Sequence, residues 1–304
     1  MSQNYYITDV FTNKVFSGAQ IAVFPDADNL SDEMMTAIAS EMNLSETVFV
    51  SKQGKNEYER TMRVFSPLGE IEFSGHPVIA TGFVLLESGA VKPTGTNTKL
   101  SLQQKKGAVE VNVTTSEQGK AEFVQFSSKV SSVIDRFTPL DGELADFLSI
   151  TPAELDHKKY STRLVSCGFP YLIVPVWNYE SVRNARFNLA AWSQSAAPQT
   201  AAQEILLFSP KTPFQDANFN ARLLGPNIGL REDPPVGTAM PAFASYLCSF
   251  DFTQQGTHTF AVDRGDEERR RSVINIEMDN KPGTELALRI GGEAVIVAQG
   301  QMYL

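Results

Sequence analysis

Two apolar stretches dominate the pattern of hydrophobic and polar positions along the chain. The first, "EFSGHPVIATGFVLLESG", covers residues 72–89, and the second, "VGTAMPAFASYLCSF", covers residues 236–250. Each starts at a glycine-led turn and continues without a polar face. A helix that is apolar all round has to be buried on every side. The pattern therefore predicts two central helices, and neither run reaches the ~18 consecutive apolar residues of a membrane span.

Around these two stretches the pattern mainly favours strands. Runs of β-branched and aromatic residues are typical of strands, and the alternation in "AVEVNV" predicts a hairpin over residues 98–115. Residues 29–31 are suited to cap a helix that continues through Asn43, with two acids in its first turn. The stretch "TPAELDHKK", residues 151–159, predicts another capped helix.

The two halves of the chain repeat one order of features. Each half has a strand with an arginine four residues before a proline, then acidic residues, then a glycine-led turn and one of the apolar helices. The corresponding residues are Arg63, Pro67, Glu70 and Gly75-His76 in the first half, and Arg222, Pro226, Asp233 and Gly237-Thr238 in the second half. Repetition of the whole ordered set indicates an internal duplication.

The predicted fold class is α+β, with two pseudo-symmetric domains, each a curved mixed sheet wrapped around its central apolar helix. We place the N-terminal domain at residues 1–120 and the C-terminal domain at residues 121–292. The last strand, about residues 293–304, is a candidate to return to the first domain. If the halves face each other, the N-termini of both central helices point into a cleft. Such helix ends attract anions, so we expect a small substrate with a carboxylate.

Composition limits the partners of the chain. A net charge of -9 over 304 residues leaves no broad basic field, so nucleic acid is not an expected partner. The one basic run, residues 269–271, follows three acids and is interpreted as a solvated, self-neutralising turn. Cys167 and Cys248 are too few for a disulfide framework and are interpreted as buried free thiols. Because the N-terminus lacks a signal-like apolar core, we expect a cytoplasmic protein without a membrane partner.

The sequence favours proton chemistry over metal or cofactor chemistry. The three histidines are scattered and the two cysteines are isolated, so no metal site is expected. A glycine-rich phosphate loop, a dinucleotide fingerprint and a Gly-x-Ser-x-Gly elbow are all missing from the sequence, so no cofactor is expected. Acid/base catalysis by carboxylate and imidazole groups remains.

Three residues are candidates for this chemistry. Glu46 stands where a helix ends and a buried strand begins, and partial desolvation there would raise its pKa toward the working range. The alternative is a solvent-facing glutamate. His76 stands at the start of the first apolar helix, where the helix dipole favours a neutral imidazole that can shuttle a proton; a structural turn residue is the alternative. Asp233 is suited either to orient the histidine or to cap the second helix region.

Several stretches carry a family resemblance that covers nearly the whole chain. They are "EMNLSET", "FSGHP", "EDPPVGTA" and the tail "RIGGEAVIVAQGQMYL". In these stretches the chain resembles the phenazine-biosynthesis PhzF-like family, which has the diaminopimelate-epimerase fold. The resemblance implies two pseudo-symmetric domains with the site in the cleft between them. It also implies a cofactor-independent isomerase, often a homodimer, whose archetype moves a hydrogen within a dihydro-hydroxyanthranilate and uses a glutamate as acid/base.

The resemblance also assigns roles to individual residues. It gives the acid/base role to Glu46 and active-site roles to His76 and Asp233. The glycine-led turns that bind the substrate match at Gly75 and Gly237, and Thr238 stands where the family has the serine of a Gly-Ser-Ala turn.

The sequence departs from its wider relatives at identifiable positions. Racemases of the same fold use two cysteines, where this chain has Ser74 and Val236. A two-thiol racemase is therefore excluded, because a valine cannot carry a proton, and Ser74 is kept as a substrate-binding candidate. Gly18-Ala19-Gln20 stands where the family often has Gly-Asn-Pro. This departure concerns the identity of the substrate more than the fold or the acid/base residues.

The functional hypothesis is a cofactor-independent isomerase of the PhzF-like type. It would move a proton within a small carboxylate-bearing substrate by acid/base catalysis at Glu46, without a metal or a nucleotide. Two alternatives stay open. One is a non-catalytic small-molecule-binding protein that keeps the cleft, and the other is an epimerase with a single base.

Overall fold

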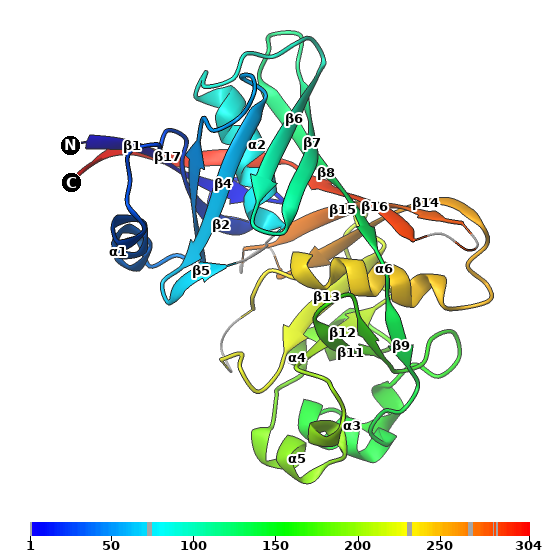
Figure 1. Ribbon diagram of the computed structural model, residues 1–304. Helices are drawn as coiled ribbons and strands as arrows, with labels where there is room; N and C mark the ends of the chain where they lie inside the picture. The colour runs from blue at the N-terminus through cyan, green and yellow to red at the C-terminus, as the bar shows by residue number, and fades with distance from the viewer. Residues whose placement is uncertain (1, 72–74, 230–232, 267–269, 282, 284) are drawn as a thin grey trace. The chain divides into compact units, whose positions relative to one another are not determined.

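The computed structural model describes residues 2–71, 75–229, 233–266, 270–281, 283 and 285–304 (Figure 1). In this part of the chain the strands form a large mixed sheet and the helices are few, which makes the protein a mixed α/β fold. The chain divides into two compact units. The first unit comprises residues 1–128, 269–272 and 289–304, and the second unit comprises residues 129–268 and 273–288.

The first unit is built from the two ends of the chain. Its elements in chain order are β1 (Ser2–Val10), β2 (Ala19–Phe24), α1 (Asp32–Met42), β3 (Glu46–Ser51), β4 (Glu59–Ser66), β5 (Gly69–Ile71), α2 (His76–Glu87), β6 (Asn97–Gln104), β7 (Gly107–Thr115), β8 (Ala121–Val130) and β17 (Ala294–Tyr303).

The second unit contains the middle of the chain. Its elements in chain order are β9 (Val133–Asp135), α3 (Asp141–Leu148), the 3-10 turn η1 (Pro152–Glu154), β10 (Arg163–Ser166), β11 (Pro170–Pro175), α4 (Tyr179–Asn184), α5 (Leu189–Gln194), η2 (Ala197–Gln199), β12 (Glu204–Ser209), β13 (Phe219–Leu224), η3 (Gly237–Ala239), α6 (Met240–Cys248), β14 (Gly256–Arg264) and β15 (Ser272–Asn280); β16 (Leu286–Gly292) runs across the boundary to the first unit.

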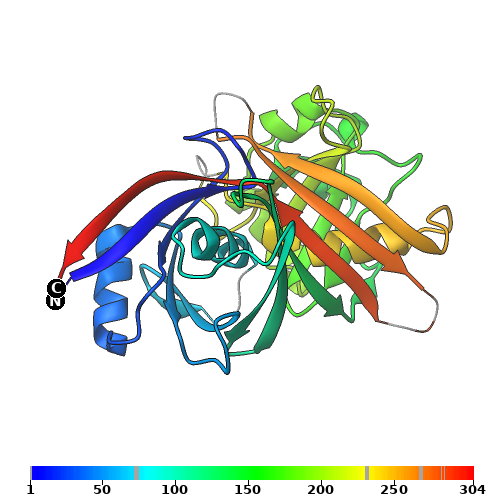
Figure 2. The same ribbon diagram turned by 90° about the horizontal axis from the view of Figure 1, so that it is seen from above.

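Strand pairing in the first unit brings the chain termini together. β1 pairs antiparallel with both β17 and β2, so the first and last strands lie side by side (Figure 2). β2 is parallel to β3, β3 is antiparallel to β4, and β4 is parallel to β6. β6, β7 and β8 follow as antiparallel neighbours, which confirms the predicted hairpin.

Helix α2 is the buried helix that the first apolar stretch predicts. Every residue from His76 to Leu86 is buried, and the helix contacts β1, β2, β3, β7 and β17. Gly82 allows the sheet to approach closely, because an added Cβ there would lie 2.9 Å from Val124 Cγ1. Gly89, with φ 74°, follows the helix in the left-handed conformation that glycine tolerates best.

Helix α1 covers the other side of strands β2, β3 and β4. Both limits of α1 are those that the sequence predicts. At its start the Ser31 hydroxyl accepts the Met34 N–H at 3.3 Å, and at its end Asn43 adopts φ 49°. Ile38 packs on Phe49, whose neighbours in sequence point to α2 instead. Strands covered on both faces in this way are apolar at almost every position.

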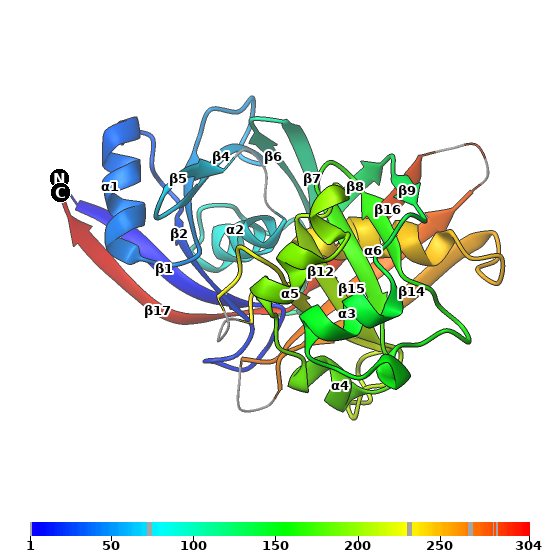
Figure 3. The ribbon, with the colours of Figure 1, turned by 90° about the horizontal axis from the view of Figure 1, so that it is seen from below.

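In the second unit, helices pack on both faces of the sheet. β11 and β12 are parallel, and each is antiparallel to a further neighbour, β10 and β13 respectively. Leu172 and Ile205 pack on one face into a cluster with α3, α4 and α5 (Figure 3). On the other face, Phe208 contacts Phe243 and Tyr246 of α6 at ring-centroid distances of 4.9 and 5.6 Å. Helix α6 therefore confirms the second predicted central helix.

Some local predictions are wrong. The stretch at residues 151–159 forms only the 3-10 turn η1, because the chain turns extended at Leu155 and bridges Val176. Cys167 and Cys248 are free, as expected, but both are only half-buried. No helix in the part of the chain that the structure describes is long and apolar enough to cross a membrane.

Candidate functional site

Glu46 occupies the first position of β3, directly after the turn that ends α1. Parallel pairing with Ile21 of β2 fixes the backbone at this point. The Glu46 side chain is only 14% exposed, so the solvent-facing alternative does not hold. A carboxylate at a strand end that is mostly shielded from water can still reach a ligand, which is the environment expected of a general base.

His76 begins helix α2 and is brought to Glu46 although 30 residues separate them in sequence. The imidazole is 4% exposed, and its Nδ1 lies 3.9 Å from Glu46 Oε2. The edge-on ring of Phe11 lies against it, with ring centroids 5.5 Å apart. A separation of 3.9 Å is longer than a hydrogen bond, but catalytic contacts often tighten only when substrate is bound. The structure thus places an acidic and a basic side chain together.

The glycine-led turn before α2 is closely packed. Gly75 is the N-cap of the helix and Pro77 lies in its first turn, as the sequence predicts. An added Cβ at Gly75 would lie 3.0 Å from Phe126 Cζ, so a larger residue would have to displace that ring. Ser74, the predicted substrate-binding neighbour, lies outside the described residues.

Asp233 lies in the second unit with arginines as its partners. Its carboxylate contacts the Arg183 guanidinium and lies 3.7 Å from Arg264 Nε, and the aspartate side chain is 15% exposed. Arg264 Nε also donates to the carbonyl of Pro234 at 3.3 Å. Arg222 donates to the Arg183 carbonyl and so fixes the end of α4. Neither arginine partner is predictable from the sequence near Asp233, because α4 and β14 are distant from it in the chain.

The second glycine-led turn forms η3 and leads into α6. Gly237 is half-buried, Thr238 is exposed, and Val236 before them is fully buried. Burial raises the pKa of the Tyr171 hydroxyl, and its hydrogen bond with Thr238 acts in the opposite direction. The Thr238 side chain is therefore held beside β11.

One charge pair of the first unit was missed, and it corrects the interpretation of the basic run as self-neutralising. The Arg270 side chain is 36% exposed, but it contacts the fully buried Asp9 carboxylate and donates to the carbonyl of Gly18 at 3.1 Å. Burial raises the Asp9 pKa, and the Arg270 charge acts against this. An aspartate within the mainly hydrophobic stretch "ITDVF" was the available signal.

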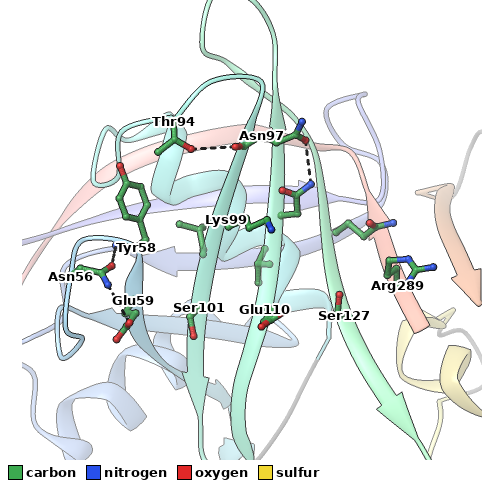
Figure 4. Close-up of a pocket in the computed structure, with 14 residues that line it drawn as sticks. Asn56, Tyr58, Glu59, Thr94, Asn97, Lys99, Ser101, Glu110, Ser127 and Arg289 are labelled. Carbon is green, nitrogen blue, oxygen red and sulfur yellow. Dashed lines mark hydrogen bonds between the residues drawn. The ribbon is translucent and has the colours of Figure 1, made fainter. Parts of the chain in front are cut away.

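A large hollow of the first unit lies apart from these residues. It has a volume of about 840 Å³ and spreads over the polar face of β6, β7 and β8, between Asn97, Glu110 and Arg289 (Figure 4). None of the predicted site residues lines it. Among the residues that the structure describes, no group of three or more His, Cys, Asp and Glu side chains is arranged to hold a metal ion.

Comparison with known proteins gives one family and a consistent set of relatives. A sequence model described as phenazine biosynthesis-like protein matches residues 8–300. The chain is similar to a trans-2,3-dihydro-3-hydroxyanthranilate isomerase of Pseudomonas fluorescens, with 34% identity over 308 residues and 99% of each chain covered. It is also similar to an uncharacterized isomerase of Mesorhizobium japonicum, with 30% identity over 305 residues, 100% of this chain and 99% of the relative.

A solved structure shows the same fold. The phenazine biosynthesis protein of the PhzF family from Bacillus anthracis superimposes with a TM-score of 0.85, at 22% sequence identity and with 100% of both chains covered. At this identity the likeness establishes the arrangement of the backbone and not the chemistry. The family resemblance seen in the sequence is confirmed by the family model that matches residues 8–300.

Proposed function

The chain belongs to the phenazine biosynthesis-like protein family, and from this premise we propose that it is a cofactor-independent isomerase that moves a proton within a small carboxylate-bearing substrate. The observation that carries the proposal is the pair of Glu46 and His76, with 3.9 Å between Oε2 and Nδ1 and with side chains that are 14% and 4% exposed. The relatives that the chain resembles are named isomerases, which agrees with the proposal.

Glu46 is the acid/base in the proposed reaction. Its carboxylate takes a proton from a substrate carbon and becomes a carboxylic acid. The electron pair of the broken C–H bond forms a new double bond to the neighbouring carbon. The electrons of the original double bond then take the proton from Glu46, and a new C–H bond forms at the far carbon of that original double bond. Atoms and electrons balance without an oxidant or a reductant. General acid/base catalysis of this kind contributes typically ~10²–10⁴-fold.

His76 supports this transfer from the first turn of α2. It hydrogen-bonds a hydroxyl or amino group of the substrate and influences the protonation state of Glu46. The first turn of a helix carries N–H groups without acceptors in the same helix, so the backbone after Gly75 is suited to bind a carboxylate. Ser74 is proposed as a further contact.

Asp233, Gly237 and Thr238 stay predicted site residues of the second unit. Conservative substitutions there test whether they act on the same substrate as Glu46. The pseudo-symmetry of two duplicated domains is likewise a proposal, which rests on the internal repeat and on the family resemblance. The homodimer is a proposal that rests on the resemblance alone, and a cytoplasmic location stays an expectation.

The proposal is tested first with the substrate named for the Pseudomonas fluorescens relative, trans-2,3-dihydro-3-hydroxyanthranilate. Ultraviolet absorbance follows a double-bond shift, and optical rotation follows a change at a stereocentre. Absorbance change supports the isomerase. Rotation change alone would favour a single-base epimerase, and calorimetric binding without either signal would favour a binding protein. Because Ala19 and Gln20 depart from the common family pattern, related small carboxylates belong in the same screen.

A further inference from the structure

One residue with strained backbone, Phe11, packs against His76 of the Glu46–His76 pair. In the described part of the chain, five non-glycine residues have positive φ, and two of them, Asn43 and Ser149, end helices α1 and α3. The other three are Phe11 at 64°, Phe16 at 65° and Arg270 at 53°. A left-handed conformation is unfavourable for bulky residues and persists only where the surroundings enforce it, often near functional sites.

Phe11 and Phe16 belong to the turn between β1 and β2, and Arg270 is hydrogen-bonded to that turn from a distant segment of the first unit. The buried Asp9 carboxylate contacts Arg270 and accepts the Phe16 N–H at 2.7 Å. Arg270 also donates to the carbonyls of Ser17 and Gly18, at 3.0 and 3.1 Å. The turn between β1 and β2 is thus held by a segment that is more than 250 residues away in sequence.

The first residue of the turn, Phe11, has a side chain that is packed against the candidate site. The Phe11 ring is 2% exposed and lies edge-on to the His76 ring, with centroids 5.5 Å apart and an angle of 73° between the planes. Strand β16 also approaches the ring closely, because an added Cβ at Gly292 would lie 2.6 Å from Phe11 Cδ1. The Phe11 N–H donates to the Glu293 carbonyl at 2.8 Å. The ring therefore packs against both the imidazole and β16.

We propose that Phe11 is a positioning residue of the isomerase, whose ring fixes the His76 imidazole so that Nδ1 faces Glu46. Phe11 does not touch the reacting atoms in this account and acts through the imidazole. An edge-on aromatic contact has a preferred geometry, whereas an aliphatic side chain would fill the space without defining the ring plane. The inference rests on the proposed function for its kinetic consequence, but the positioning itself can be measured without turnover.

The kinetic test compares two substitutions in the same turn. Phe11→Leu removes the ring beside His76, and Phe16→Leu removes a ring from a residue with the same backbone conformation whose side chain is 72% exposed. We expect Phe11→Leu to lower kcat about 10-fold with little change in KM, as the loss of one aromatic contact of this strength predicts. The matched control Phe16→Leu should keep kcat within about 2-fold, as expected of an exposed position. Equal losses in both variants would contradict the proposal.

A second readout needs no substrate. The chain has three histidines, so NMR can follow the titration of His76, which the variant His76→Asn assigns. In the wild-type background, Glu46→Gln should change the His76 titration midpoint. We expect this change to fall at least by half in the Phe11→Leu background and to persist in the Phe16→Leu background. A double-mutant comparison of this kind isolates the coupling between two residues.

The outcomes separate failure of the inference from failure of the proposed function. An unchanged coupling between Glu46 and His76 in the Phe11→Leu background overturns the positioning role, whatever the activity. If the coupling between Glu46 and His76 is lost in the Phe11→Leu background and the wild type turns over no substrate, the positioning role of Phe11 is supported and the proposed isomerase function is contradicted. If Phe11→Leu does not fold, Gly292→Ala serves instead, because the added Cβ would displace the Phe11 ring without removing it. It should reduce the coupling in the same direction.

Discussion

Two carboxylates of the predicted site have very different surroundings. Glu46 in the first unit lies near one imidazole, at 3.9 Å, whereas Asp233 in the second unit lies between the guanidiniums of Arg183 and Arg264. Both are mostly shielded from water. A carboxylate enclosed by two guanidiniums is held in one orientation, while one beside a titratable ring can exchange a proton. We therefore expect Glu46 to carry the proposed proton transfer and Asp233 to keep a fixed charge.

The largest expected effect concerns Glu46. Glu46→Gln keeps the shape of the side chain but removes its ability to take a proton, so kcat should fall by roughly 10²–10⁴-fold. Binding of a carboxylate ligand, measured by calorimetry, should stay near the wild-type value. Turnover within a few-fold of wild type would exclude Glu46 as the acid/base.

At Asp233 we expect the main effect of a substitution on the stability of the protein. Asp233→Asn leaves Arg183 and Arg264, whose side chains are 11% and 8% exposed, without their counter-charge. Removing one partner of a buried ion pair costs about 3–5 kcal/mol of unfolding free energy, so we expect a loss near the lower limit.

Urea unfolding followed by tryptophan fluorescence measures this loss of unfolding free energy in the second unit, which contains Asp233. Both tryptophans of the chain, Trp177 and Trp192, lie in the second unit. Asp32→Asn is the control, because Asp32 pairs with Arg63 on the exposed surface of the first unit. Its fluorescence transition should match wild type. An Asp233→Asn protein as stable as wild type would show that the guanidiniums do not depend on this carboxylate.

A third carboxylate, Asp9, extends the comparison to a buried group with one guanidinium. Burial raises its pKa above the ordinary 3.8, and the Arg270 charge opposes this only in part. The folded protein therefore binds this proton more tightly than the unfolded chain does. The contribution of Asp9 to stability is present below about pH 3.8 and is lost as the pH rises through the raised pKa.

The pH profile of Asp9→Asn tests this sign. The unfolding free energy of wild type minus that of the variant should be highest in acid, decrease as the pH rises, and then level off. Circular dichroism during urea unfolding at several pH values supplies the measurement. A difference that increases with pH would mean that Arg270 more than offsets the burial of Asp9.

The smallest effect is expected at Glu70, a carboxylate between two partly exposed cations. The hydrogen bond from Arg63 lowers the Glu70 pKa, and Lys105 adds to this. Its contribution to stability is present above the ordinary value of 4.5 and is lost as the pH falls through the lowered pKa. Because Arg63 and Lys105 are 28% and 56% exposed, Glu70→Gln should cost less than about 1 kcal/mol at neutral pH. A difference that persists unchanged in acid would show a packing effect instead.

The sequence was sufficient for features that depend on local chemistry. The limits of α1 follow from capping at Ser31 and Asn43, and the burial of α2 follows from its lack of a polar face. The pairing of Glu46 with His76 was reached through the family motif, because their proximity depends on how β3 and α2 pack. The predicted helix at residues 151–159 is wrong because Leu155 joins Val176 across the chain.

The features that the sequence left out all depend on distant contacts. Asp9 and Arg270 are 261 residues apart, and nothing near the basic run indicates its buried partner. Asp233 and Arg183 are 50 residues apart and meet only once α4 has formed. Buried charges need such partners, because an unpaired charge away from water is unfavourable. A buried acid in an apolar strand is therefore a signal that a partner exists, without saying where.

The central claim is that Glu46 moves a proton between substrate carbons. The most direct measurement is deuterium incorporation from D₂O into the carbon framework of trans-2,3-dihydro-3-hydroxyanthranilate or another bound carboxylate, read by mass spectrometry. Wild type and Glu46→Gln are compared at equal ligand occupancy. The account predicts deuterium on carbon with the wild type and background levels with the variant. Equal incorporation by both proteins would contradict it.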